Sequence, residues 1–249
     1  MTTSKRVAVV TGASAGIGEA TAKTLAAQGF HVVVVARRAD RIAALADEIG
    51  GTSVVADVTD GAAVDALASG LDRVDVLVNN AGGAKGLEPV AEADLEHWRW
   101  MWETNVLGTL RVTRALLPKL VASGDGLIVT VTSVAAMEIY DGGAGYTSAK
   151  HAQGALHRTL RGELLGKPVR LTEIAPGAVN TEFSLVRFGG DQQRADAVYA
   201  GMTPLVAADI AEVIGFVVSR PSHVNLDQIV MRPRDQATAT RRATGPGGR

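Results

Sequence analysis

A tyrosine and a lysine stand four positions apart in the segment GYTSAKHAQGAL, residues 145–156. Residues at positions i and i+4 share one face of a helix, so Tyr146 and Lys150 would lie side by side. A free phenol has a pKa of about 10, and a neighbouring ammonium group would lower that pKa by favouring the phenolate. The spacing fits either a general acid–base pair or an ordinary surface pair, and the rest of the chain must decide between them.

A glycine-rich turn follows the first apolar run of the chain. Gly12, Gly16 and Gly18 occur in TGASAGIGEATAKTLAAQG, residues 11–29, with the spacing G-x-x-x-G-x-G. At a turn from strand to helix, glycines let a pyrophosphate approach the backbone and meet the N–H groups that open the helix. A plain tight turn is the alternative, but the position after the first strand favours nucleotide binding.

The end of the second apolar run indicates which nucleotide would bind. In VVARRADR, residues 34–41, Ala36 occupies the place where an acid would hold a ribose 2′-hydroxyl, and Arg37 and Arg38 follow. Guanidinium groups can bind a 2′-phosphate through paired hydrogen bonds, so the sequence predicts NADP in preference to NAD. Asp57 would accept a hydrogen bond from the adenine amino group or serve as a turn residue, and Asp60 is the better candidate for a helix cap.

Short apolar runs alternate with amphipathic ones along the whole chain, which predicts one α/β domain over residues 1–249. The expected fold is a Rossmann-type, doubly wound, parallel seven-stranded sheet with helices on both faces. The expected strands are 6–11, 31–36, 52–56, 74–79, 127–132, 169–174 and 228–231, and the expected helices are 17–28, 39–49, 60–70, 92–121, 146–165 and 208–218.

Composition excludes several classes of function. The 249 residues are 47% hydrophobic and 20% charged, with a formal net charge of −1 and no cysteine. The near-zero charge argues against a nucleic-acid or anionic-membrane partner. The absence of cysteine excludes disulfides and thiolate nucleophiles, and the five histidines lack the spacing of metal ligands, so we expect no metal. Without a signal-peptide pattern or an apolar span, the chain is expected to be cytoplasmic.

Six segments, in this order, resemble the classical short-chain dehydrogenase/reductase family over about residues 5 to 231. They are TGASAGIG (11–18), NNAG (79–82), TNVLG (104–108), TS (132–133), YTSAK (146–150) and PGAVNT (176–181). The resemblance implies that Tyr146 is the general acid–base and Lys150 its electrostatic partner. It also implies that Ser133 holds the substrate carbonyl and that Asn105 anchors a water linking Lys150 to solvent.

The same resemblance implies an NADP site and a homo-oligomer. Asn79 would lie beside the adenosine half of the cofactor, and Thr181 would meet the nicotinamide amide. A tetramer, or a dimer, would pair the helices around 92–121 and 146–165. The expected cofactor-binding residues are Gly12, Ser14, Gly16, Ile17, Gly18, Arg37, Arg38, Asp57, Val58, Asn79, Ala81, Gly82, Tyr146, Lys150, Pro176, Gly177, Val179 and Thr181.

The polar, loop-like stretch 182–203 is expected to be a substrate lid. TEFSLVRFGGD (181–191) and SRPSHVNLDQIVMRP (219–233) resemble the branch that oxidises 3-hydroxy acids and β-hydroxy amino acids with NADP. Arg187 would clamp a carboxylate or face solvent. Glu138 would border the pocket, where it would disfavour a simple anion or meet an ammonium group. The alternatives are an NADPH-dependent carbonyl reductase of secondary metabolism, acting on a ketone or aldehyde without a carboxylate, and an NADP(H)-sensing protein without turnover.

Two further features have open interpretations. The arginine-rich tail 232–249 would be flexible and solvated, or a subunit-contacting arm. Trp98, Trp100 and Trp102 resemble a stacking platform, but on a helix Trp98 and Trp102 share a face that Trp100 does not, so we expect core or subunit packing.

Overall fold

The computed structural model describes residues 5–243. Across these residues, seven parallel strands form one sheet in the order β3-β2-β1-β4-β5-β6-β9, which confirms the predicted sheet. The strands are β1 (Val7–Thr11), β2 (His31–Ala36), β3 (Thr52–Val55), β4 (Val76–Asn79), β5 (Gly126–Val131), β6 (Val169–Pro176) and β9 (Gln228–Met231). The chain changes direction across the sheet between β1 and β4, where parallel α/β sheets leave a crevice at the carboxyl ends of the strands.

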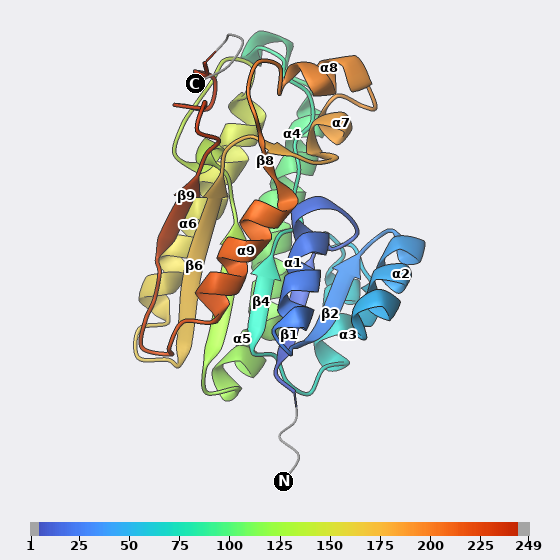
Figure 1. The fold of residues 1–249 in the computed structure, drawn as a ribbon, viewed down its shortest axis with the longest axis vertical. Coiled ribbons are helices and arrows are strands. Elements are labelled where there is room, and N and C mark those ends of the chain that lie inside the picture. The colour runs from blue at the N-terminus through green and yellow to red at the C-terminus, as the bar shows by residue number, and fades with distance from the viewer. Residues whose placement is uncertain (1–4, 244–249) are drawn as a thin grey trace.

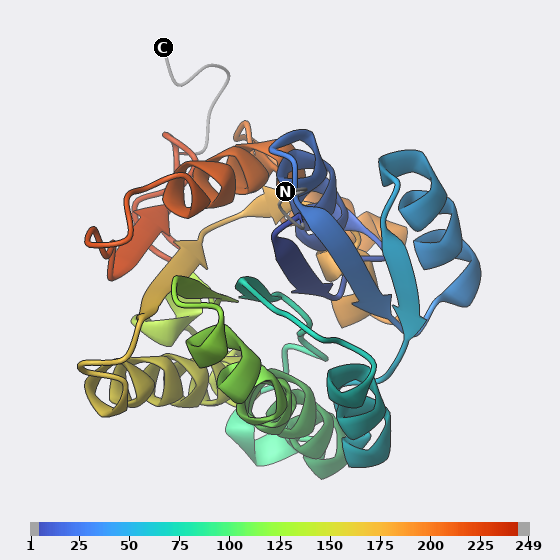
Figure 2. The same cartoon turned by 90° about the horizontal axis from the view of Figure 1, so that it is seen from below.

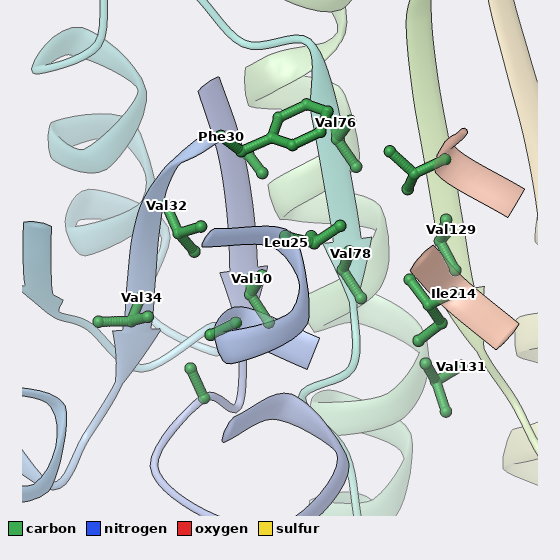
Figure 3. Close-up of a cluster of buried hydrophobic side chains, with 14 of the residues drawn as sticks. Val10, Leu25, Phe30, Val32, Val34, Val76, Val78, Val129, Val131 and Ile214 are labelled. Carbon is green, nitrogen blue, oxygen red and sulfur yellow. The ribbon is translucent and has the colours of Figure 1, made fainter. Parts of the chain in front are cut away.

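Helices cover both faces of the sheet (Figure 2). Side chains alternate between the faces: in β1, Val10 packs against one layer of helices, whereas Val9 packs against the other. The first layer comprises α1 (Gly16–Ala27), α2 (Ala39–Ile49) and α9 (Ala207–Val218), and the second includes α3 (Gly61–Ser69), α5 (Gly108–Ala122) and α6 (Ala144–Glu163). Figure 3 shows the first core, where Leu25 of α1 and Ile214 of α9 meet the valines of the strands. Burial of each such side chain contributes roughly 1.5–3 kcal/mol, which explains why valine-rich runs became strands with two covered faces.

The prediction of a single helix over residues 92–121 is wrong in detail. The structure has α4 (Leu95–Trp102), a π-helical turn at Glu103–Leu107, and then α5. The helix begins late because Asp94 caps it, accepting hydrogen bonds from the backbone N–H groups of Glu96 and His97. A π turn inserts one extra residue into the helical ladder, and hydrophobic periodicity carries no signal for it.

The expected lid is more ordered than a loop. Residues 182–203 contain α7 (Phe183–Arg187) and α8 (Gln192–Ala197), and a small parallel pair, β7 (Val179–Asn180) with β8 (Leu205–Val206), frames them. The first part of the tail, residues 232–243, lies at the same end of the molecule as α7 and α8 (Figure 1). Its last residues, 244–249, fall outside the described part. Among residues 5–243, no helix has the length and apolar character needed to cross a bilayer.

Candidate active site

A cavity of about 750 Å³ opens where the carboxyl ends of the strands meet the lid and the tail. Its walls come from the loops that follow β1 to β6, from α7, and from the tail residues Gln236, Ala239, Thr240 and Arg242. Segments far apart in the sequence therefore meet at the carboxyl ends of the strands, as the strand order requires.

The glycine turn forms an anion cradle at one end of the cavity. Gly12 and Gly16 have φ of +65° and +58°, which side chains disfavour. A Cβ on Gly18 would lie 2.4 Å from the carbonyl oxygen of Gly12. α1 begins with Ala15 at its N-cap, which has no side chain able to accept from the first N–H groups. The cradle thus offers close backbone approach and free donors, and it fits a pyrophosphate.

Cations gather beside this cradle. Arg37 and Arg38 both line the cavity, and the Arg37 side chain is 65% exposed, with Nη1 3.5 Å from Asp57 Oδ2. Arg38 donates from Nε to Ser14 Oγ at 2.9 Å. Arg38 and Arg41 also donate to the carboxylate of Glu182. This end of the cavity fits a further phosphate on the ribose.

Asp57 is both a turn residue and a wall residue. Its Oδ1 accepts from the N–H and the hydroxyl of Thr59 at 2.9 and 2.8 Å. Burial opposes its ionisation, but the Thr59 hydrogen bonds and the charge of Arg37 outweigh burial and lower the pKa of Asp57. As expected, Asp60 caps α3, accepting from the N–H groups of Ala62 and Ala63.

Tyr146 and Lys150 lie on the first turns of α6, with Nζ 5.8 Å from the centre of the phenol ring. Both are buried, with exposed fractions of 7% and 4%. Burial raises the pKa of Tyr146, and Tyr140 adds to the increase, while Ser133 and Arg187 act in the opposite direction. Burial lowers the pKa of Lys150 to about 7, against the charge of Glu173. Without the cofactor, the protein's own groups therefore raise the pKa of the phenol, because desolvation outweighs the Ser133 hydrogen bond and the Arg187 charge.

A chain of buried hydrogen bonds runs from Lys150 to Asn105. Lys150 Nζ donates to Gln153 Oε1, Gln153 Nε2 donates to Thr109 Oγ1, and Thr109 Oγ1 donates to the carbonyl oxygen of Asn105, each at 2.8 Å. The Asn105 side chain is itself occupied by the backbone of Gly83 and Met101. Two side chains thus link Lys150 to the backbone carbonyl of Asn105, and the water that Asn105 is expected to anchor between Lys150 and solvent stays a prediction.

Most predicted site residues line the cavity, and four do not. Gly18 and Asn105 support the wall from behind, while Asn79 is buried, donates to Thr113 Oγ1 at 2.8 Å and does not line the cavity. Glu138 does not border the cavity: its oxygens accept from Arg232 Nη2 and from the N–H of Ala239, both at 2.5 Å. The residues that line the cavity as predicted are Gly12, Ser14, Gly16, Ile17, Arg37, Arg38, Asp57, Val58, Ala81, Gly82, Ser133, Tyr146, Lys150, Pro176, Gly177, Val179, Thr181 and Arg187.

Arg187 reaches from α7 to the phenol. Its Nε donates to the carbonyl oxygen of Gly86 at 2.9 Å and its Nη1 to the hydroxyl of Tyr140 at 3.1 Å. Its Nη2 is buried and has no hydrogen-bond partner among residues 5–243. The guanidinium lies 5.8 Å from the centre of the Tyr146 ring, and the ring of Phe183 meets the same ring edge-on at 5.5 Å. A half-buried guanidinium whose Nη2 has no partner among residues 5–243, lying beside a proton donor, can bind an anionic group of a substrate.

Several wall residues have no clear signal in the sequence. Trp100 lines the cavity, whereas Trp98 and Trp102 border a separate hollow on the other side of α4. Gln236 of the tail accepts at Oε1 from the N–H of Ala178 at 2.8 Å. Arg242 donates to the carbonyl oxygen of Val198, which joins the tail to the lid. A polar, arginine-rich composition reads as solvated, so only the folded geometry shows that this segment closes a wall.

Comparisons with known proteins agree with the geometry. A family model described as short chain dehydrogenase matches residues 6–188. The chain is 86% identical to an uncharacterized oxidoreductase of Mycobacterium tuberculosis (strain H37Rv), over 98% of this chain and 97% of the relative. It is 42% identical to a sulfoacetaldehyde reductase of Chromohalobacter salexigens, over 92% and 94%.

Among solved structures, the closed form of serine dehydrogenase complexed with NADP+ superposes with a TM-score of 0.91 at 36% identity, covering 96% of this chain and 100% of that one. The fold, the Tyr146, Lys150 and Ser133 arrangement and these matches lead to one conclusion: the chain belongs to the short-chain dehydrogenase family and is an oxidoreductase.

Proposed function

We propose that the protein is an NADP-dependent oxidoreductase that interconverts an alcohol and a carbonyl compound carrying an acid group, a 3-hydroxy acid or a β-hydroxy amino acid. Arg187 lies beside Tyr146, and its Nη2 is buried without a hydrogen-bond partner among residues 5–243. This observation carries the proposal. Serine, 3-hydroxy acids and sulfoacetaldehyde all have one carbon between the reacting carbon and the acid group. The Arg187 guanidinium carbon lies 5.8 Å from the centre of the Tyr146 ring, so it is placed to pair with an acid group near the reacting carbon.

The cofactor would lie along the cavity from the cradle to Tyr146. The glycine turn would hold the pyrophosphate, Arg37 and Arg38 the 2′-phosphate, and Thr181 the nicotinamide amide. The residues fit this group because the cradle admits no side chain and cations stand beside it. When bound, NADP supplies or accepts the hydride.

The chain's own residues would manage the proton. In reduction, Tyr146 donates its hydroxyl proton to the forming alkoxide, and in oxidation it takes the proton of the alcohol. Ser133 gives the same oxygen a second, preorganised hydrogen bond. Lys150 would hold the ribose, and its hydrogen bond to Gln153 would orient the ammonium group. α7 and α8 would act as the lid that excludes water, with Arg187 orienting the acid group.

The test is a substrate panel with an arginine variant. L-serine, D-serine, allo-threonine and 3-hydroxypropanoate, with NADP, should react faster than simple secondary alcohols. Arg187→Met should raise KM for the acids about tenfold or more, because a charge-assisted hydrogen bond is lost. Arg194→Met, in α8 and outside the cavity wall, is the matched control and should change little.

A second candidate is a carbonyl reductase for a larger neutral ketone or aldehyde. The aromatic side chains of Trp100, Tyr140 and Phe183 in the cavity wall favour it. If NADPH reduces such ketones, none of the acids reacts, and Arg187→Met leaves KM unchanged, the acid-group proposal is wrong and this candidate remains.

We also propose a homo-oligomer, a tetramer or a dimer, in the cytoplasm. Leu95 of α4, Trp102 of α4 and Leu110 of α5 are 63%, 44% and 41% exposed on the helices expected to pair. Light scattering at micromolar protein should give a multiple of the chain mass, and a monomer would contradict the assembly. The absence of cysteine is compatible with a reducing compartment, which fractionation of the source cells would test.

A further inference from the structure

The carboxylate of Glu182 lies between two arginines at the edge of the cavity. Oε2 accepts from Arg38 Nη1 at 2.7 Å and Oε1 accepts from Arg41 Nη1 at 2.6 Å, so each oxygen has its own guanidinium. Hydrogen bonds from Arg41 and Arg38 lower the pKa of Glu182, which is therefore an anion at neutral pH. Two guanidiniums around one oxyanion form the arrangement that would also hold a phosphate.

Glu182 also connects the two ends of the cavity. It immediately precedes α7, whose first residue, Phe183, packs on the ring of Tyr146 and whose last residue, Arg187, borders the same ring. Arg38 and Arg41 belong to the start of α2, on the far side of the glycine turn. The carboxylate thus holds the beginning of α7 against the site expected to take the ribose phosphate.

A 2′-phosphate and the Glu182 carboxylate need the same donors. The phosphate and the carboxylate cannot both lie within hydrogen-bond distance of Arg38, because two anions so close together repel each other. The Glu182 ion pairs are weak enough to be exchanged, since the side chains are 41–51% exposed and solvent screens them. A phosphate near neutral pH carries more charge than a carboxylate and can replace it, whereas a ribose 2′-hydroxyl cannot.

We infer that Glu182 is a specificity-determining residue that competes with the 2′-phosphate for Arg38 and Arg41, so that a 2′-phosphorylated nucleotide displaces it and frees the start of α7. An unphosphorylated nucleotide leaves Glu182 on its arginines and α7 in place. The inference rests on the proposed use of NADP and concerns this chain's own selection between cofactors.

The test uses two nucleotides that differ only in the 2′-phosphate and cannot react: adenosine 2′,5′-bisphosphate and 5′-AMP. In calorimetric titrations, Glu182→Gln should bind the bisphosphate about three- to tenfold more tightly than wild type, because its competitor is gone, and should bind 5′-AMP unchanged. Glu182→Ala should act in the same direction. Glu48→Gln removes a carboxylate of α2 that pairs with Lys23 instead, and should change neither affinity.

Unchanged or weaker binding of the bisphosphate by both Glu182 variants overturns the inference. A second readout uses the wild-type protein: hydrogen exchange of residues 183–188 should be faster with saturating bisphosphate than with saturating 5′-AMP. Equal exchange would show that Glu182 keeps its arginines and would also overturn it. If wild type does not prefer the bisphosphate over 5′-AMP, the proposed use of NADP fails instead, which keeps the two failures distinct.

Discussion

Burial governs the chemistry of the individual side chains in the cavity. It keeps Tyr146 protonated by raising its pKa, and it brings the pKa of Lys150 to about 7, where small changes of environment alter its charge. A buried proton donor that stays protonated suits reduction of a carbonyl. Oxidation needs the phenolate, and a positive charge brought close to the ring would favour it.

Tyr146→Phe should reduce turnover by about 10²–10⁴-fold, since it removes the proton donor and almost no volume. Binding of NADPH, followed by its fluorescence, should stay near the wild-type value because the phenol hydroxyl is a minor part of the expected cofactor site. Wild-type turnover by this variant would refute the assignment of Tyr146 as the general acid.

The single residues whose place in the cavity wall could be predicted are those whose neighbours are close in the chain or fixed by the strand order. Tyr146, Lys150 and Ser133 follow helix and strand ends, so their meeting could be foreseen. Glu138 could not be placed, because its partner Arg232 lies 94 positions away in a tail without periodicity. Asn79 looked like a wall residue, yet it points to Thr113 because strand side chains alternate between faces.

The π-helical turn lies between α4 and α5 and is linked through hydrogen bonds to the catalytic helix α6. It places Asn105 against Gly83, and the hydrogen bonds through Thr109 and Gln153 continue to Lys150. Apolar spacing predicted a continuous helix here, because one inserted residue barely alters the pattern over so long a segment.

Gln153→Leu should act through Lys150 as a positioning change. Loss of the Oε1 acceptor removes an interaction that favours the ammonium form, so the pKa of Lys150 should fall further below its ordinary value. The limb of the pH–rate profile that reports Lys150 should move to lower pH, and turnover should drop about tenfold. Gln153→Glu, which keeps an acceptor, should restore the limb toward wild type or beyond it. An unshifted profile in Gln153→Leu would rule out this role.

Residues 234–249 should be dispensable for folding but not for substrate binding. The sheet ends at Met231, whereas Gln236, Ala239, Thr240 and Arg242 form cavity wall. A chain ending at Pro233 should melt within a few degrees of wild type and show KM for its substrate raised about tenfold or more. Unchanged KM would mean that the tail merely covers the surface.

At the level of the whole molecule, the fold was the most predictable feature. Valine-rich runs such as HVVVVA are typical of strands that are covered on both faces. Because these runs alternate with helical segments, the sequence predicts a doubly wound parallel sheet. The lid was less predictable, because α7 and α8 are short and owe their place to tertiary contacts such as the Ser184–Tyr199 hydrogen bond.

His157 should limit stability on the acid side. It is buried in α6, with Nδ1 3.0 Å from Thr130 Oγ1, and burial lowers its pKa from 6.5 to about 4. Between these values the unfolded chain binds more protons than the folded one, so the free energy of unfolding falls as pH falls, by up to roughly 3 kcal/mol at pH 4. Urea titrations at pH 7 and 4.5 should show a smaller loss for His157→Gln than for wild type. The exposed His223→Gln should match wild type, and identical losses for all three proteins would contradict the assignment.

Glu138 accepts hydrogen bonds from Arg232 and from the N–H of Ala239, and these bonds hold the tail at the cavity. This arrangement decides at which end of the chain a fusion partner should be placed. Because tail residues Gln236, Ala239, Thr240 and Arg242 form part of the cavity wall, an affinity tag or reporter fused close behind residue 243 would crowd the mouth of the cavity. β1 begins at the amino ends of the strands, at the end of the sheet away from α7, α8 and the tail, so a fusion directly before residue 5 would leave the mouth clear (Figure 1). Assays of inhibitors or substrates on carboxyl-tagged material should then report weaker binding than assays on amino-tagged material.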